Sequence, residues 1–312
     1  MTTTTTQAAP SAAPRAEGRP RTPKEGGAWR RRAPLLPALV FTIAVTQVPF
    51  LVTVVYSFQS WNLVRPGSQH FVGLRNYIDV FADSTFRGAM LNTVVLTVVC
   101  VLVSMLLGLG LALLLDRKFA GRGVVRTLII TPFLILPAAG ALLWKTTMFD
   151  PVYGLLNFVF GTDIDWLSEF PLASVMTQVI WQWTPFMTLL ILAGLQAQSK
   201  EVLEAAQVDG AGRWRTFVSI TLPQLSRYLQ LAALLGAIYI VNSFDAIYLM
   251  TQGGPGTAST NLPFYIYQRA FEGFDVGQSS AMGVIVVILT LIVATFALRL
   301  MFRAFDVSGG VK

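Results

Sequence analysis

The chain has 312 residues, of which 54% are hydrophobic and 12% charged, and its mean hydropathy is +0.60. Soluble globular proteins are about one quarter charged, so this composition excludes a freely soluble enzyme and indicates a membrane protein. The net charge of +7 does not indicate a nucleic-acid-binding protein, because the basic residues lie between long apolar runs. The single cysteine, Cys100, excludes an internal disulfide and a cysteine metal cluster.

Residues 1–28 are rich in Thr, Ala, Pro and Arg and have no apolar periodicity. Such a composition cannot bury a core, which predicts a disordered tail. The first apolar run comes after this long polar tail and is long enough to span the membrane. Both features differ from a cleaved signal peptide, so we expect the run to stay as a membrane anchor. Residues 29–312 are predicted to form one transmembrane domain.

Six apolar stretches are each long enough to cross a bilayer as a helix, because a span needs about 20 residues and must satisfy its backbone internally. They predict an all-α integral membrane protein, a bundle of six transmembrane helices. Internal prolines, Pro132, Pro137 and Pro185, are expected to kink two of the spans. The six stretches are residues 34–58, 90–115, 125–144, 172–195, 228–250 and 280–302.

The basic residues are distributed unequally between the two sides of such a bundle. The tail, the loops 116–126 and 196–227 and the C-terminal end carry 18 Lys and Arg, whereas the three segments between them carry five. The positive-inside rule therefore predicts both termini in the cytoplasm. The outward segments 59–89, 145–171 and 251–279 contain aromatic residues that either form a cap for an outside partner or anchor the spans at the membrane interface.

The cytoplasmic segment 199–223 has the pattern of two short helices rather than of a simple turn. Ser199 is suited to cap the first helix, whose apolar face comprises Val202, Leu203 and Ala206, and Asp209-Gly210 is suited to end it. Trp214, Phe217 and Val218 predict a second short helix, which Pro223 is expected to close. Two exposed apolar faces need either lipid headgroups or a protein groove.

Polar residues within the fifth predicted span indicate a solute pathway. Asp245 lies in the span, and a buried charge there usually faces a partner or a wet cavity. Tyr239, Asn242 and Ser243 lie at i, i+3 and i+4 and are expected to share a helix face. Hydroxyl-bonding groups beside aromatic rings suit carbohydrate recognition, whereas the alternative is polar contacts between helices. The fourth span contributes a second cluster with Gln182, Trp183 and Phe186.

The cytoplasmic segment reads Glu204-Ala205-Ala206-x3-Gly210-x9-Ile220-x-Leu222-Pro223. It resembles the EAA signature of permease subunits of binding-protein-dependent bacterial ABC importers. In that family this segment, the coupling-helix loop, docks on the cytoplasmic ATPase. The resemblance therefore implies that the loop at 199–223 couples ATP hydrolysis to transport through eight residues. These are Glu204, Ala205, Ala206, Asp209, Gly210, Ile220, Leu222 and Pro223.

Further motifs resemble the carbohydrate-uptake permeases related to the maltose, glycerol-phosphate and polyol systems, over about residues 30–305. The motifs are Phe71-Val72-Gly73-Leu74-x-Asn76-Tyr77, Asn92-Thr93, Trp183-Thr184-Pro185-Phe186, Gly253-Gly254-Pro255 and Phe264-Tyr265-x-Tyr267-x-x-Ala270-Phe271. The resemblance implies transport of a sugar, oligosaccharide or polyol across the bacterial cytoplasmic membrane. It assigns solute contacts to the fourth and fifth spans, or to a partner permease instead. The candidate contacts are Gln182, Trp183, Phe186, Tyr239, Asn242, Ser243 and Asp245.

The chain contains no GxxxxGK[ST] sequence, and we therefore expect it to be non-catalytic and to bind no cofactor or metal. The resemblance places ATP and Mg²⁺ on a separate cytoplasmic ATPase dimer. It also implies a second homologous permease and an extracytoplasmic solute-binding protein. A permease for a non-carbohydrate solute is one alternative. An ion-coupled secondary transporter is another, although it would need more ionisable residues within the membrane than Asp245.

Overall fold

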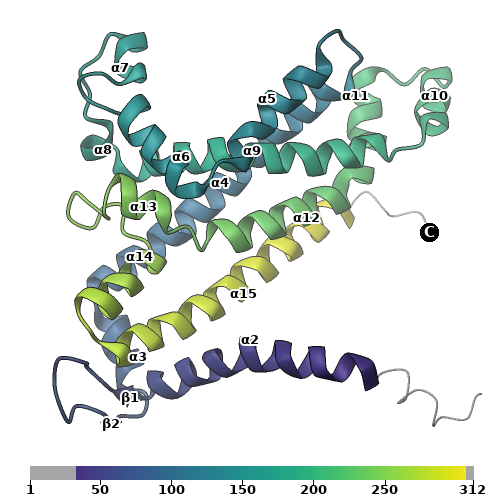
Figure 1. Cartoon of the computed structure of the whole chain (residues 1–312). Coiled ribbons are helices and arrows are strands. Elements are labelled where there is room, and N and C mark those ends of the chain that lie inside the picture. Colours follow the sequence, from purple (N-terminus) through teal and green to yellow (C-terminus); the bar gives the residue numbers. More distant parts are fainter. Residues whose placement is uncertain (1–32, 307–312) are drawn as a thin grey trace, which may run out of the picture. The chain divides into compact units, whose positions relative to one another are not determined.

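The computed structural model describes residues 33–306, which are mostly helical (Figure 1). The predicted tail, residues 1–28, lies outside the described residues. The chain divides into two units, Met1–Leu51 and Val52–Lys312. The first unit holds the 3-10 turn η1 (Ala33–Leu35) and most of α2 (Leu36–Ser57), a helix of 22 residues. The second unit holds all the other described elements.

A small scaffold follows α2, in the segment that the charge distribution predicts to face outward. Strands β1 (Gln59–Ser60) and β2 (His70–Phe71) pair antiparallel, and α3 (Arg75–Ala82) comes next. The buried Nδ2 of Asn76 donates hydrogen bonds to the main-chain oxygens of Ser57 (2.9 Å) and Gln59 (2.8 Å). The motif that contains Asn76 therefore stabilises the turn between α2 and β1.

The centre of the second unit is a packed pair of long helices, α4 (Ser84–Asp116) and α9 (Pro171–Gln196), with α12 (Leu222–Ile240) against both. Small residues allow the backbones to approach, as is usual within membranes. A Cβ atom at Gly108 of α4 would lie 2.8 Å from the Cβ of Met187 in α9. A Cβ atom at Gly194 of α9 would lie 2.6 Å from Cγ of Tyr228 in α12.

The third predicted span is broken. It consists of α5 (Arg122–Leu134) and α6 (Pro137–Leu143), which is followed by the π-helical turn η2 (Trp144–Met148), and the two parts are bent by 100°. Ile135 and Leu136 have extended backbones, which agrees with the preference of residues that precede a proline. Two short helices then connect to α9, namely α7 (Leu155–Phe160) and α8 (Trp166–Glu169).

The fifth predicted span, residues 228–250, is also not one helix, so this expectation was wrong. The helix α12 ends at Ile240, and α13 (Asp245–Met250) begins after a gap of four residues. The chain then forms α14 (Leu262–Tyr267), the π-helical η4 (Gln268–Glu272) and α15 (Val276–Asp306). Between α9 and α12 lie α10 (Lys200–Val208), α11 (Arg213–Thr216) and the π-helical η3 (Phe217–Thr221).

Three described helices, α2, α4 and α9, are long and apolar enough to cross a membrane. The bent pair of α5 with α6–η2 makes a fourth when it is counted as one span. The structure thus gives a helical protein with three or four candidate spans among the described residues.

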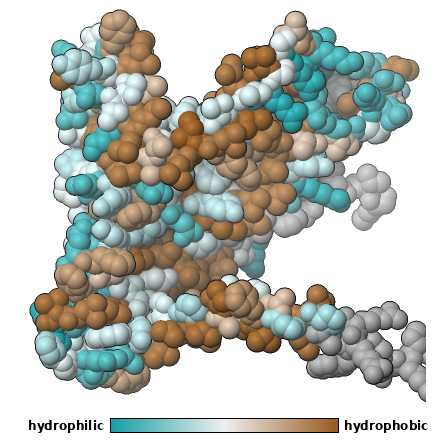
Figure 2. Space-filling model, viewed as in Figure 1, coloured by the Kyte–Doolittle hydropathy of each residue, from teal (hydrophilic) through white to brown (hydrophobic). Residues whose placement is uncertain are grey.

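The short elements of the second unit gather at its two opposite ends (Figure 1). One end carries α7, α8, α13 and α14, and the other carries α10 and α11. Hydrophilic residues gather over α10 and α11, whereas hydrophobic residues cover much of the helices between the two ends (Figure 2). The segments that the charge distribution predicts to face outward therefore lie together, away from the predicted coupling segment.

Candidate functional site

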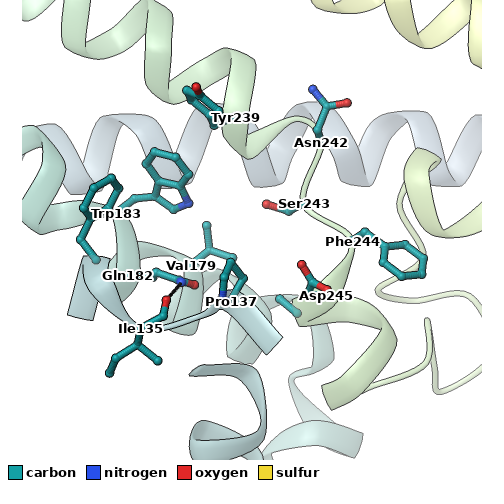
Figure 3. Close-up of a pocket in the computed structure, with 12 residues that line it drawn as sticks. Ile135, Pro137, Val179, Gln182, Trp183, Tyr239, Asn242, Ser243, Phe244 and Asp245 are labelled. Carbon is teal, nitrogen blue, oxygen red and sulfur yellow. Dashed lines mark hydrogen bonds between the residues drawn. The ribbon is translucent and has the colours of Figure 1, made fainter. Parts of the chain in front are cut away.

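A cavity of about 390 Å³ lies where the two helix breaks meet (Figure 3). It contains six of the seven predicted solute contacts, and the exception is Phe186. The sequence did not indicate the residues that the α5–α6 break contributes, although Pro132 and Pro137 predicted a kink there. The lining residues are Phe133, Ile135, Pro137, Val179, Gln182, Trp183, Tyr239, Asn242, Ser243, Phe244, Asp245 and Ala246.

Gln182 stabilises the first break. Its Nε2 donates a hydrogen bond of 3.1 Å to the main-chain oxygen of Ile135, which the break leaves without an intrahelical partner. Its Oε1 accepts a hydrogen bond of 2.9 Å from Nε2 of Gln178. Because Gln182 is 93% buried and both ends of its amide are engaged, it positions the cavity wall and retains only one N–H for a ligand.

Asn261 and Asn242 stabilise the second break. Nδ2 of Asn261 donates to the main-chain oxygen of Ser243, and Nδ2 of Asn242 donates to that of Ile238 (2.8 Å). The expected helix face of Tyr239, Asn242 and Ser243 was wrong, because the chain leaves the helix after Ile240. The three residues still line one cavity, since the turn directs the chain back beside it.

Aromatic rings form one wall of the cavity. The rings of Trp183 and Tyr239 are stacked with centroids 5.4 Å apart and planes at 26°. Behind them, Phe186 stacks on Phe133 and packs edge-on against Trp183. The side chain of Phe186 therefore supports the aromatic wall and does not line the cavity itself. Tyr239 is 58% exposed, which leaves a ring available to a ligand.

Asp245 supplies the polar wall opposite. The sequence predicted that Asp245 lies within a continuous span, but the structure places it in the first turn of α13, where it is exposed. A carboxylate at the amino end of a helix is favourable with respect to the helix dipole. At the other end of α13, Nζ of Lys145 donates a hydrogen bond of 3.0 Å to the main-chain oxygen of Leu249. The short helix thus has a negative group at its start and a positive group at its end.

The predicted coupling segment begins with a capped helix, as its sequence indicates. Oγ of Ser199 accepts a hydrogen bond of 3.3 Å from the main-chain N–H of Val202, and α10 ends before Asp209. Gly210 has a φ of +77°, a conformation that favours glycine. Ala206 is buried, whereas Glu204, Ala205, Asp209 and Gly210 are exposed. The predicted apolar face is only partly buried, because Val202 is 43% exposed.

The second half of this segment differs from the expectation. Pro223 does not close a helix, because α11, η3 and α12 follow each other without interruption and Pro223 lies in the first turn of α12. Ile220, Leu222 and Pro223 are half-buried, and Trp214 is exposed. Nε2 of Gln198 donates a hydrogen bond of 3.0 Å to the main-chain oxygen of Thr221. This bond ties the end of α9 to the start of α12.

An ionic cluster at the end of the fold that is predicted to face outward joins α4 to η4, and nothing in the sequence pattern indicated it. Asp83, the N-cap of α4, accepts hydrogen bonds from Tyr265 Oη, from Arg269 Nη2 (2.9 Å) and from the main-chain N–H of Thr85 (2.8 Å). Burial raises the pKa of Asp83, but the hydrogen bonds from Tyr265, Thr85 and Arg269 outweigh it, so the pKa lies below its usual value.

The motif Asn92-Thr93 has a clear structural role close to this cluster. Nδ2 of Asn92 donates to the main-chain oxygens of Ala258 (3.1 Å) and Thr260 (2.9 Å). Oγ1 of Thr93 accepts a hydrogen bond of 2.9 Å from the main-chain N–H of Leu262. These contacts fix the glycine-rich loop on α4, so the motif stabilises the end of the fold that carries α13 and α14.

The chain is similar in sequence to a known protein family and in fold to solved structures. Residues 104–307 match the model of the family described as the binding-protein-dependent transport system inner membrane component. The chain is 39% identical over 279 residues to the probable ABC transporter permease protein y4oQ of Sinorhizobium fredii, covering 88% of this chain and 90% of that protein. It is 33% identical over 276 residues to the trehalose transport system permease protein SugA of Mycobacterium tuberculosis, covering 88% and 89%.

Among solved structures, the fold resembles a bacterial ABC transporter that imports the acidic polysaccharide alginate. The TM-score is 0.75 at 23% identity, and the match covers 89% of this chain and 96% of that chain. The family model spans α9, the predicted coupling segment, α12 and α15. The chain therefore belongs to the family of inner membrane components of binding-protein-dependent transport systems, and it is a permease subunit of an ABC transporter.

Proposed function

We propose that the chain carries a sugar, oligosaccharide or polyol through the cavity between its two helix breaks. The observation that supports this most directly is the cavity wall, in which the stacked rings of Trp183 and Tyr239 lie opposite the hydroxyl-bonding side chains of Ser243 and Asp245. Aromatic faces cover the C–H surface of a sugar, and carboxylate and hydroxyl oxygens bond its O–H groups. The similarity to a trehalose permease supports the same class of solute.

The coupling segment would transmit movement of the ATPase to this cavity. The exposed residues Glu204, Ala205, Asp209 and Gly210 are available to a cytoplasmic partner. Ile220, Leu222 and Pro223 lie where the segment joins α12, and α12 ends next to the cavity at Tyr239. Because Gln198 ties α9 to the start of α12, a push on the segment would move both helices that wall the cavity.

The rest of the assembly follows from this assignment. The chain would cross the bacterial inner membrane six times, with α12–α13 and α15 as the fifth and sixth spans and both termini in the cytoplasm. A cytoplasmic ATPase dimer would bind ATP and Mg²⁺, a second homologous permease would complete the pathway, and an extracytoplasmic protein would deliver the solute. This chain would perform no covalent chemistry and hold no cofactor.

Reconstitution tests the function. The permease pair, the ATPase and the solute-binding protein are assembled in proteoliposomes, and uptake of labelled sugars and polyols is measured with and without ATP. We expect ATP-dependent uptake of at least one carbohydrate. Uptake that needs an ion gradient and not ATP would contradict the proposal, as would ATP-dependent uptake restricted to amino acids, peptides or metals.

A further inference from the structure

The solute cavity carries a single kind of charge. Among the described residues that line it, Asp245 is the one charged side chain, and no salt bridge to it is found within residues 33–306. Lys145 is engaged with the carbonyl of Leu249 at the far end of α13. The carboxylate of Asp245 therefore faces the cavity without a cationic side chain opposite it among these lining residues, which makes this wall acidic.

The hydrogen-bonding groups of the cavity are also unequally distributed between donors and acceptors. The Asp245 carboxylate offers acceptor oxygens, and Asn242 has used one N–H on Ile238 and keeps its amide oxygen and its second N–H. Gln182 is engaged at both ends of its amide and keeps one N–H, so donors are fewer than acceptors in this lining. Ser243 and Tyr239 have hydroxyl groups, which can donate or accept. Figure 3 shows the oxygen atoms of Ser243 and Asp245 pointing into the space that Trp183 faces.

An excess of acceptors favours a ligand that brings O–H donors, and a negative wall disfavours a ligand that brings negative charge. A neutral polyol or sugar has many hydroxyl donors and no charge. A uronic acid, a sulfonated sugar or a sugar phosphate would place an anionic group, which only accepts hydrogen bonds, against Asp245. The aromatic wall of Trp183 and Tyr239 binds C–H surface and discriminates little between these solutes.

We propose that the cavity selects neutral polyhydroxylated solutes and rejects anionic sugars through Asp245. The inference rests on the proposed function, because it assumes that this cavity holds the solute. It distinguishes the chain from the importer of an acidic polysaccharide whose fold it shares.

Direct binding tests the selection without the solute-binding protein, which has a specificity of its own. The purified complex of permeases and ATPase is titrated calorimetrically with three forms of one sugar, namely the neutral sugar, its uronic acid and its amino sugar. We expect the neutral form to bind at least about tenfold more tightly than the uronic acid. A ratio of this size requires only a modest repulsion between two like charges within one cavity.

A charge-neutral variant isolates the residue responsible. Asp245→Asn keeps the size of the side chain and should reduce the difference between the neutral and acidic sugars to less than about threefold. Asp163→Asn is the matched control, since Asp163 is an exposed outward carboxylate that does not line this cavity, and it should leave the difference unchanged.

Two results would overturn the inference, namely binding of the uronic acid that equals or exceeds that of the neutral sugar, or no binding of any of the three forms. The amino sugar carries a positive charge that Asp245 attracts, so its tight binding would agree with the inference. ATP-dependent carbohydrate uptake, measured separately, would then show that the proposed function itself still holds. Absence of that uptake would instead contradict the proposed function.

Discussion

The ammonium group of Lys145, at the start of η2 in the α6–η2 segment, donates a hydrogen bond of 3.0 Å to the main-chain oxygen of Leu249, near the end of α13. Both short helices follow a break, and both breaks line the cavity. Lys145 therefore adds a hydrogen bond between two segments that also pack against each other, and it helps to hold α13 in place relative to the aromatic wall.

Replacing Lys145 should therefore weaken the apparent affinity for the solute. Lys145→Met leaves the carbonyl of Leu249 without its donor, at a cost of about 1–2 kcal/mol, and we expect the KM for solute uptake to rise about fivefold. Lys145→Arg retains a donor and should restore most of the affinity. Arg65→Met is the control, because Arg65 is exposed and its side chain has no hydrogen bond among the described residues. An Arg variant as impaired as the Met variant would argue against this role.

The cluster of Asp83, Tyr265 and Arg269 should stabilise the contact between α4 and the segment α14–η4. Its groups are partly exposed, so we expect Arg269→Met to destabilise the protein by about 1 kcal/mol in thermal unfolding in detergent. The pKa of Asp83 is lower in the folded chain than the ordinary value of 3.8. Its contribution is therefore complete above about pH 4 and is lost as the pH falls further.

The matched control for this cluster is Asp79→Asn. Asp79 forms only an exposed pair with Arg75 at 3.8 Å, and its loss should change stability by less than about 0.5 kcal/mol. A wild-type protein that loses the Arg269-dependent stability between pH 8 and pH 5 would contradict the assignment to Asp83.

The contact between α4 and α9 depends on Gly108. A methyl group at this position would lie 2.8 Å from the Cβ of Met187 and 3.0 Å from the main-chain nitrogen of Thr188, so the helices would have to separate. We expect Gly108→Ala to destabilise the protein by about 1–3 kcal/mol. Gly110→Ala in the same helix meets no atom within 4 Å and should be neutral or slightly stabilising. Equal unfolding temperatures for the two variants would contradict the close packing.

The turn after α10 should control coupling. Gly210 has a φ of +77° and Gly212 a φ of −65°, and neither has a neighbour within 4 Å of an added Cβ atom. Gly210→Ala should strain the turn by about 1 kcal/mol and reduce ATP-coupled uptake several-fold, whereas Gly212→Ala should not. Uptake and ATP hydrolysis are measured together, and equal uptake by both variants would remove the turn from the coupling path.

The sequence predicted the first helix of the predicted coupling segment well, because the signals there are local, whereas the second half differed from the expectation at Pro223. A cap at Ser199 and a left-handed glycine at Gly210 act within a few residues of the helix that they delimit. The resemblance to the permease family was confirmed by the family model and by the relatives.

The break after Ile240 was not predictable in the same way. No proline or glycine occurs between Tyr239 and Met250, and the polar residues at the break have a spacing that also fits one face of a continuous helix. What stabilises the non-helical backbone is the side chain of Asn261, which reaches the carbonyl of Ser243 from 18 residues further along the chain. A tertiary contact of this kind leaves no local signal, and the same holds for Gln182 at the first break.

The central claim is that the solute passes through the cavity between Tyr239 and Asp245 and that ATP drives its passage. The most direct measurement is carbohydrate uptake and ATP hydrolysis by the reconstituted transporter that carries Tyr239→Ala and Asp245→Ala together. We predict that uptake falls more than about tenfold, while the complex still assembles and hydrolyses ATP. Such a decrease corresponds to a loss of roughly 1.4 kcal/mol or more in the stabilisation of the transition state for transport. Uptake at the wild-type rate and affinity would contradict it.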